Sequence, residues 1–243
     1  MKNISCFLLV LLQTFFLSNS GYSSPGDILN FQLGGTITSL YNNGAAINDT
    51  AGQKWNRLTE VNETTLNNLQ YSDGKSNNIS VTYNTPVYAG GISTSFTSSS
   101  LDFTLFRGYM GTNSLNNGYI SLSGLDNGTY NVYVYAQGKK TAAVSSLQMT
   151  LITPVSNESI SLSNNGKANV LIEDTNWIMT SIVVTDGTLD MVIEKNSLLN
   201  GIQLQQISTV VPEPGNVMLL GIGGILVFSF IRRRSNDRSS VGT

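Results

Sequence analysis

The segment GLDNGTYNVYVYAQG, residues 124–138, carries the clearest fold signal in the chain. Its Asp126-Asn127-Gly128 stretch predicts a tight turn, because Asn and Gly tolerate a positive φ angle. After the turn the side chains alternate between two faces, with one face more apolar than the other. The first face has Tyr130, Val132, Val134 and Ala136, and the second has Asn131, Tyr133, Tyr135 and Gln137. This period of two residues predicts a β-strand with one buried face.

Similar short runs, separated by Gly, Asn and Pro, occur along most of the chain. They predict strands at 28–33, 79–83, 119–123, 144–152, 159–162, 170–173, 177–185, 189–194 and 198–207. The region 36–70 is less regular and fits a short helix or a long loop. About eight to ten short strands with turns between them predict an all-β fold, an antiparallel β-sandwich.

Composition and charge narrow the class of protein. Only 12% of the 243 residues are charged, against about 25% in a typical soluble domain. Residues 21–210 contain eight Lys or Arg and thirteen Asp or Glu, a net charge of −5. An acidic body argues against nucleic acid as a partner, because binding to phosphates needs a basic surface.

The amino terminus has the pattern of a secretory signal peptide. Lys2 precedes a mostly apolar run from 4 to 17, and Ser18 and Ser20 suit a cleavage site before Gly21. We therefore expect residues 1–20 to be removed, with a short uncleaved membrane helix as the alternative. Cys6 is the only cysteine, so a cleaved chain has no disulfide.

The chain contains no histidine, which excludes a Ser-His-Asp triad and the usual zinc sites. A Ser-Lys pair is formally present in Ser72-Asp73-Gly74-Lys75, but Gly74 indicates a surface turn. The carboxylate groupings, Glu173-Asp174 and Asp186/Asp190/Glu194, are typical of solvated strand ends. No cofactor is predicted, and a Ca²⁺ ion held by scattered backbone oxygens would leave no pattern in the sequence.

The last 35 residues, 209–243, form a separate segment. Residues 217–231 are uncharged, and a helix over about 215–231 predicts a single membrane span at the short end of the usual range. Pro212 and Pro214 mark its start, because proline cannot lie in a helix interior. Arg232, Arg233 and Arg234 begin a basic tail, 232–243, that predicts a cytoplasmic end. A buried core helix is the alternative.

This segment resembles the PEP-CTERM sorting signal of Gram-negative bacteria. The resemblance rests on Val211-Pro212-Glu213-Pro214, the apolar run and the three arginines, in that order. It implies export, an inner-membrane anchor and recognition by exosortase, a membrane protease-transpeptidase, followed by release to the cell surface or extracellular matrix. Proteins with this signal are often found in bacteria that make exopolysaccharide and biofilms. Nine residues follow Arg234, a longer tail than is usual in that group.

The body, residues 21–208, resembles exported galactose-binding-like jelly-roll domains over about 28–207. The shared features are Trp55-Asn56, Ser72-Asp73-Gly74, the 124–135 strand with its turn, and Leu199-Asn200-Gly201-Ile202. The resemblance implies a β-sandwich that binds carbohydrate through loops at one end, and it does not imply catalysis.

The sequence therefore favours a non-enzymatic exported surface or matrix protein whose β-sandwich either binds carbohydrate, such as exopolysaccharide, or packs into the extracellular matrix. Trp55, with Asn56 and Arg57, is the candidate sugar-stacking site, and a packing role for Trp55 is the alternative. Trp177 is predicted to lie in the core. A carboxylate-based polysaccharide-degrading enzyme and an unprocessed single-pass membrane protein with a structural ectodomain remain the alternative functions.

Overall fold

The structure, a computed structural model, describes part of the chain between residues 26 and 209. The described ranges are 26–34, 41–42, 45–47, 52–59, 63–84, 87–90, 103–112, 115–138, 145–164 and 168–209. The predicted signal peptide, the sorting segment from residue 210 onward and the Lys139-Lys140 loop lie outside these ranges. Within them, no helix has the length and apolar character needed to cross a membrane.

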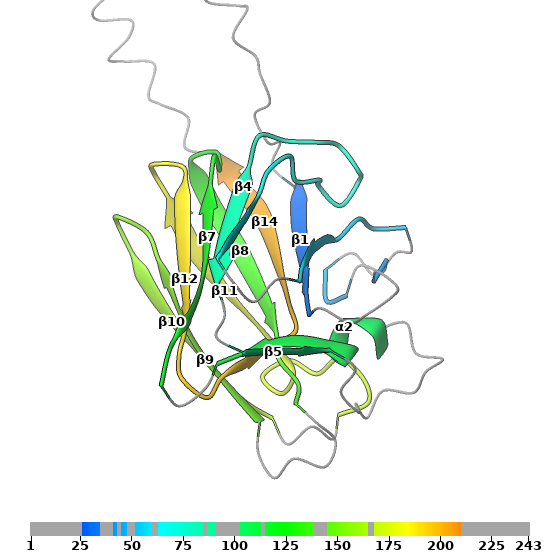
Figure 1. The fold of residues 1–243 in the computed structure, drawn as a ribbon. Helices are drawn as coiled ribbons and strands as arrows, with labels where there is room; N and C mark the ends of the chain where they lie inside the picture. The colour runs from blue at the N-terminus through cyan, green and yellow to red at the C-terminus, as the bar shows by residue number, and fades with distance from the viewer. Residues whose placement is uncertain are drawn as a thin grey trace, which may run out of the picture. The chain divides into compact units, whose positions relative to one another are not determined.

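Two sheets form most of the described fold (Figure 1). The five-stranded sheet has the order β11 (Trp177–Val184), β8 (Gly128–Tyr135), β14 (Gly201–Thr209), β1 (Ile28–Leu33) and β2 (Asn56–Leu58). The six-stranded sheet has the order β10 (Asn157–Asn164), β9 (Ser145–Ile152), β12 (Thr188–Ile193), β7 (Gly118–Ser123), β4 (Ser80–Asn84) and β3 (Thr64–Leu66).

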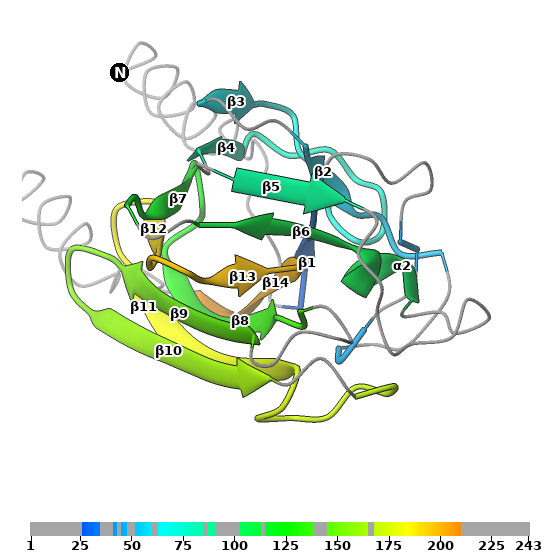
Figure 2. The same ribbon diagram turned by 60° about the horizontal axis from the view of Figure 1, so that its bottom comes forward.

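A third sheet lies at one end of the sandwich (Figure 2). It consists of β13 (Leu198–Leu199), β6 (Gly108–Gly111) and β5 (Val87–Gly90), and a short helix, α2 (Phe103–Arg107), precedes β6. We call this end the loop end. The chain enters β1 and leaves β14 at the opposite end, where the Gly26 amide donates to the Gln206 carbonyl at 2.8 Å. We call that the terminal end.

The main core lies between the two large sheets, which confirms the prediction of a β-sandwich. Alternate residues of each strand point inward, as the two-residue period requires. The five-stranded sheet contributes Phe31, Val132, Val134, Ile202 and Leu204, and the six-stranded sheet contributes Ile120, Leu122, Leu151, Met191 and Ile193, all at most 1% exposed.

Several predicted elements need correction. The fourteen described strands exceed the predicted eight to ten, and β1 pairs with β2 in parallel rather than antiparallel. The described residues of the irregular region 36–70 include β2 and β3, and a short helix, α2, lies further along the chain. The predicted strand at 170–173 does not form, because Asn176 uses the backbone groups that a strand would pair. Its Oδ1 accepts from the Ile172 amide at 2.8 Å, and its Nδ2 donates to the Val170 carbonyl at 2.8 Å.

Candidate functional site

The outer face of the five-stranded sheet combines aromatic, amide and hydroxyl side chains. Cross-strand register sets the outward-facing residues of β14, β8 and β11 in three rows. From the loop end, the rows are Gly201–Tyr135–Trp177, Gln203–Tyr133–Met179 and Gln205–Asn131–Ser181. The two halves of this face differ in what covers them.

The half toward β1 is covered and belongs to a second, smaller core. Tyr41, Ala45, Trp55, Leu105, Phe106 and Tyr135 pack together there. The polar groups beneath them bond to each other: the Tyr135 hydroxyl donates to Gln203 Oε1, and Gln203 Nε2 donates to Asn30 Oδ1 at 2.9 Å. Asn30 Nδ2 then donates to the Lys54 carbonyl at 2.9 Å. Because these side chains are buried and hydrogen-bonded to one another, we assign them a structural role.

The half toward β11 is only partly covered, where Tyr133 and Trp177 pack against the second core and still reach solvent. The rings of Tyr133 and Trp177 stack there, with centroids 6.1 Å apart and an interplanar angle of 28°. Both side chains are partly exposed, and Met179 beside them is 40% exposed. We define the open patch as Tyr133, Trp177 and Met179 together with the polar residues of the next row, Asn131, Ser181 and Gln205.

The open patch presents polar groups that other parts of the described chain do not use. Ser181 Oγ donates to Asn131 Oδ1 at 2.7 Å, which orients the Asn131 amide. Within the described ranges, no hydrogen bond involves the Trp177 Nε1, the Tyr133 hydroxyl or the side-chain amide of Gln205. An aromatic surface edged by amide and hydroxyl groups is the combination that holds a sugar ring, by stacking and by hydrogen bonds to its hydroxyls.

The loop before β11 fixes Trp177 in place. The Asp174 amide donates to the Trp177 carbonyl at 2.8 Å, and Asp174 itself has a left-handed backbone, φ 58°. Buried Asn176 anchors this loop to β8, because its Nδ2 also donates to Gln137 Oε1 at 3.0 Å. These bonds hold the backbone at Trp177, and its ring packs against Tyr133 and the second core. The aromatic pair therefore has little side-chain freedom left to lose on binding a ligand.

The residues that the sequence predicts to bind sugar, Trp55, Asn56 and Arg57, lie outside the open patch. Trp55 is 5% exposed and packs its ring edge-on against Tyr41, with centroids 5.0 Å apart, which is the packing alternative. Asn56 uses its side chain on backbone: Nδ2 donates to the Asn30 and Gln70 carbonyls, and Oδ1 accepts from the Gln70 amide. Arg57 is partly buried in β2. These three residues do not form an exposed stacking surface.

The core prediction for Trp177 is confirmed in part. Trp177 starts an edge strand, where its ring packs against the second core and stays partly exposed. The signal that could have found the patch is the second face of the 128–135 strand, which combines Tyr133 with Asn131. Alternation shows that this face differs from the core face, but it does not show which half of it stays open.

Other chemically suggestive residues lie in a surface turn and on the outer face of the six-stranded sheet. Residues 72–75 make the predicted surface turn, with Gly74 at φ 89°. There Lys75 Nζ lies 2.7 Å from Asp73 Oδ2, and this bond holds the pKa of Asp73 below its usual value and raises that of Lys75. Asp190 accepts from Ser121 Oγ at 2.6 Å on a solvent-facing sheet surface. Among the described residues, no three His, Cys, Asp or Glu lie close enough to hold a metal ion.

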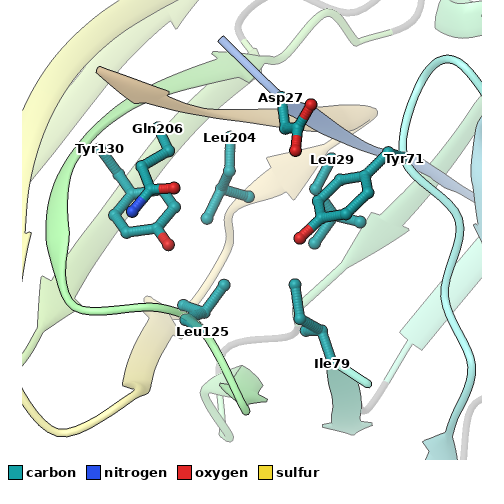
Figure 3. Close-up of a pocket in the computed structure, with 8 residues that line it drawn as sticks. All are labelled: Asp27, Leu29, Tyr71, Ile79, Leu125, Tyr130, Leu204 and Gln206. Atoms are coloured by element: carbon teal, nitrogen blue, oxygen red, sulfur yellow. The ribbon is translucent and has the colours of Figure 1, made fainter. Parts of the chain in front are cut away.

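A cavity opens between the two sheets at the terminal end (Figure 3). The side chains around it are Asp27, Leu29, Tyr71, Ile79, Leu125, Tyr130, Leu204 and Gln206. The cavity has a volume of about 10 Å³, which is room for about one water molecule. The Tyr130 hydroxyl donates a hydrogen bond to the Asp126 carbonyl at 2.8 Å. A sugar ring does not fit this cavity, so the open patch is the stronger candidate.

Comparisons with known proteins give distant structural similarity only. No family model matches the chain, and no curated protein matches it. Among solved structures, a CBM35 module of Abf62 from Cellvibrio japonicus aligns with 50% of this chain and 86% of its own, at 14% identity and a TM-score of 0.31. A CBM35 described as Xyl-CBM35 in complex with a disaccharide containing glucuronic acid aligns over the same shares, at 15% identity and a TM-score of 0.29. An exo-β-1,3-galactanase from Phanerochaete chrysosporium aligns with 59% of this chain but 29% of its own, at 12% identity and a TM-score of 0.29. Similarity at this level carries no functional assignment.

Proposed function

We propose that this protein is an exported, non-enzymatic surface or matrix protein that binds polysaccharide through the open patch. The observation that carries the proposal is the partly exposed Tyr133–Trp177 stack, beside Asn131, Ser181 and Gln205 on one sheet face. Stacked aromatic rings offer a flat apolar surface to a sugar ring, and the amides beside them offer donors and acceptors to its hydroxyls.

Export and sorting form the second part of the proposal. The signal-peptide pattern at 1–20 supports export, and the Pro-Glu-Pro motif, apolar run and arginines support recognition by exosortase at the inner membrane. Mass spectrometry of the mature protein tests this part. A carboxyl terminus near Pro212–Pro214 is expected, and an intact tail through Thr243 would leave the unprocessed membrane protein as the better description.

Binding is tested by affinity electrophoresis and calorimetry with a panel of soluble polysaccharides. Trp177→Ala is expected to weaken binding about fivefold to thirtyfold, because one lost stacking partner contributes on the order of 1–2 kcal/mol. Tyr119→Ala is the matched control, since Tyr119 is a partly exposed tyrosine on the outer face of the six-stranded sheet. Equal losses in the two variants, or no binding by the wild type to any member of the panel, would refute the binding role.

The alternative of a polysaccharide-degrading enzyme is tested with the same panel. Reducing ends are measured after long incubation with the wild type. We expect no increase above the protein-free blank. Sustained release of reducing ends, abolished by a carboxylate substitution, would replace the binding proposal with an enzymatic one.

A further inference from the structure

The two sheets each expose one long edge strand on the same side of the sandwich. β11 ends the five-stranded sheet and β10 ends the six-stranded sheet. The two strands lie against each other across the sandwich, as Figure 2 also shows. Each has eight residues, whereas the strands at the other edges, β2 and β3, have three. Long unpaired edges are places where another strand can add, and short ones are not.

β11 lacks the features that usually protect an edge strand. Its sequence, WIMTSIVV, contains no charged residue, proline or glycine, and its pairing with β8 is regular over all eight positions. Met179 and Val183 on its outer face are 40% and 37% exposed. A long, regular, apolar edge invites pairing unless a partner covers it.

The backbone defines which part of β11 is available. At Trp177 the outer side of the strand is already bridged by Glu173. Among the described residues, no strand pairs with the outer side of the remaining segment, 178–184. The middle residue of that segment is Ser181.

We propose that this edge is the interface between two copies of the chain, which pair β11 with β11 in antiparallel fashion about a two-fold axis at Ser181. Antiparallel pairing of one strand with its own copy is self-complementary, as a two-fold interface requires. The register that centres on Ser181 sets Met179 opposite Val183 of the second copy, and Ile178 opposite Val184. No charged side chain of β11 meets another across this pairing.

The area available fits a specific dimer. The seven residues 178–184, at about 3.4 Å each, give an edge of about 24 Å, and two sheets about 10 Å apart, with their side chains, give a width of about 20 Å. The contact is then roughly 500 Å² per copy and about 1,000 Å² in total, the lower limit for a specific interface. β10 contributes the second layer, and its one charged residue is Glu158.

The dimer would join two open patches on one continuous sheet face. Each copy contributes Trp177 and Tyr133 close to the paired edge, so a long polysaccharide could contact both. Two linked sites raise the effective affinity without any new contact. The pairing itself does not depend on polysaccharide binding, because the residues of 178–184 supply it.

Cysteine crosslinking tests the register in the full chain, solubilised in detergent. With Cys6→Ser in place, Ser181→Cys introduces the only cysteine. Directly opposed residues in an antiparallel pair have Cα atoms about 4.5–5.5 Å apart, within the range of a disulfide. Thr65→Cys is the matched control, an exposed position on the short edge strand β3. Under mild oxidation, we expect the Ser181→Cys chain to form covalent dimers at least tenfold faster than the control.

Ser181→Lys supplies the second arm, measured by analytical ultracentrifugation. It sets two lysines against each other on the axis, and like charges opposite one another destabilise strand pairing. The wild type is expected to sediment as a dimer, and Ser181→Lys to have a dissociation constant about two- to fivefold higher. A wild type that stays monomeric at about 100 µM, equal crosslinking at positions 181 and 65, or an undiminished Ser181→Lys dimer would each overturn the proposal.

Discussion

At the scale of single residues, Asn200 joins three segments at the loop end. Its Oδ1 accepts from the Gln137 amide at 2.5 Å, and its Nδ2 donates to the Gly108 carbonyl at 2.7 Å. It also divides the predicted 198–207 strand into β13 and β14. This gives a physical reason for the Leu199-Asn200-Gly201 sequence: the amide supplies both a donor and an acceptor at a point where backbone groups leave the sheets.

Replacing Asn200 by alanine is expected to lower the free energy of unfolding by about 3 kcal/mol. The substitution leaves a buried amide and a buried carbonyl without partners, at about 1–3 kcal/mol each. Urea denaturation followed by tryptophan fluorescence measures the change. Asn127→Ala, at an exposed turn position, is the control and should change stability by less than about 0.5 kcal/mol. Similar stability of the two variants would contradict this account of Asn200.

Asp186 gives a prediction for pH. Its carboxylate accepts from the Thr188 hydroxyl at 2.7 Å and from the Thr188 amide at 3.0 Å, and these bonds lower its pKa below the usual 3.8. Because the folded-state pKa is the lower one, the carboxylate stabilises the fold above pH 3.8, and this contribution is lost as pH falls through the folded value.

The measurement is the melting temperature between pH 6 and pH 2 for the wild type and Asp186→Asn. The difference between the two melting temperatures should shrink below about pH 4, where the wild-type carboxylate becomes neutral. A difference that stays constant over this range would show that the charge of Asp186 contributes nothing to folding.

The two tryptophans show what residue-level reasoning can and cannot reach. Trp55 lies in a polar, irregular segment, which favours exposure, yet that segment packs onto the sheet and buries it. Trp177 starts an apolar run, which favours burial, yet the run is an edge strand. Both outcomes depend on which segments cover which sheet face, and a periodic pattern does not contain that information.

At the scale of elements, strands with one solvent-facing side were predicted well. β7 and β12 alternate between buried and exposed positions, and the alternation in the sequence marks them. β1 was also predicted, although all six of its residues are buried. Its polar residues, Asn30 and Gln32, face the second core rather than solvent. The sequence pattern therefore predicts the strand, but it does not show that a second core covers its polar face.

The join between β8 and β14 gives a prediction at this scale. At Gly128, an added Cβ would lie 2.1 Å from the Ser208 carbonyl oxygen, beside the bulge between Gln206 and Ser208. Gly128→Ala must therefore displace backbone, and we expect a loss of about 2–3 kcal/mol in unfolding free energy. Chemical denaturation measures the loss. A change below about 0.5 kcal/mol would show that the strands separate here without strain.

At the scale of the whole described body, the site and the chain ends lie apart. The chain enters at Ile28 and leaves after Thr209 at the terminal end, whereas the Trp177 row of the open patch lies toward the loop end. Strands of eight residues span about 26 Å. The aromatic pair therefore lies near the opposite end of the described body from the last residue of β14.

The body is expected to fold without the sorting segment, because β14 already ends at Thr209 and completes the five-stranded sheet. A chain that stops after Thr209 should keep its melting temperature within about 2 °C of the full chain and should keep its polysaccharide affinity.

A chain that stops after Asn200 is the control. It lacks β14, which pairs with both β8 and β1, so the inward-facing Ile202 and Leu204 leave the core and the sheet is cut in two. We expect no cooperative melt from this shorter chain by circular dichroism. A cooperative melt after the shorter truncation, or none after the longer one, would show that the folding unit does not end with β14.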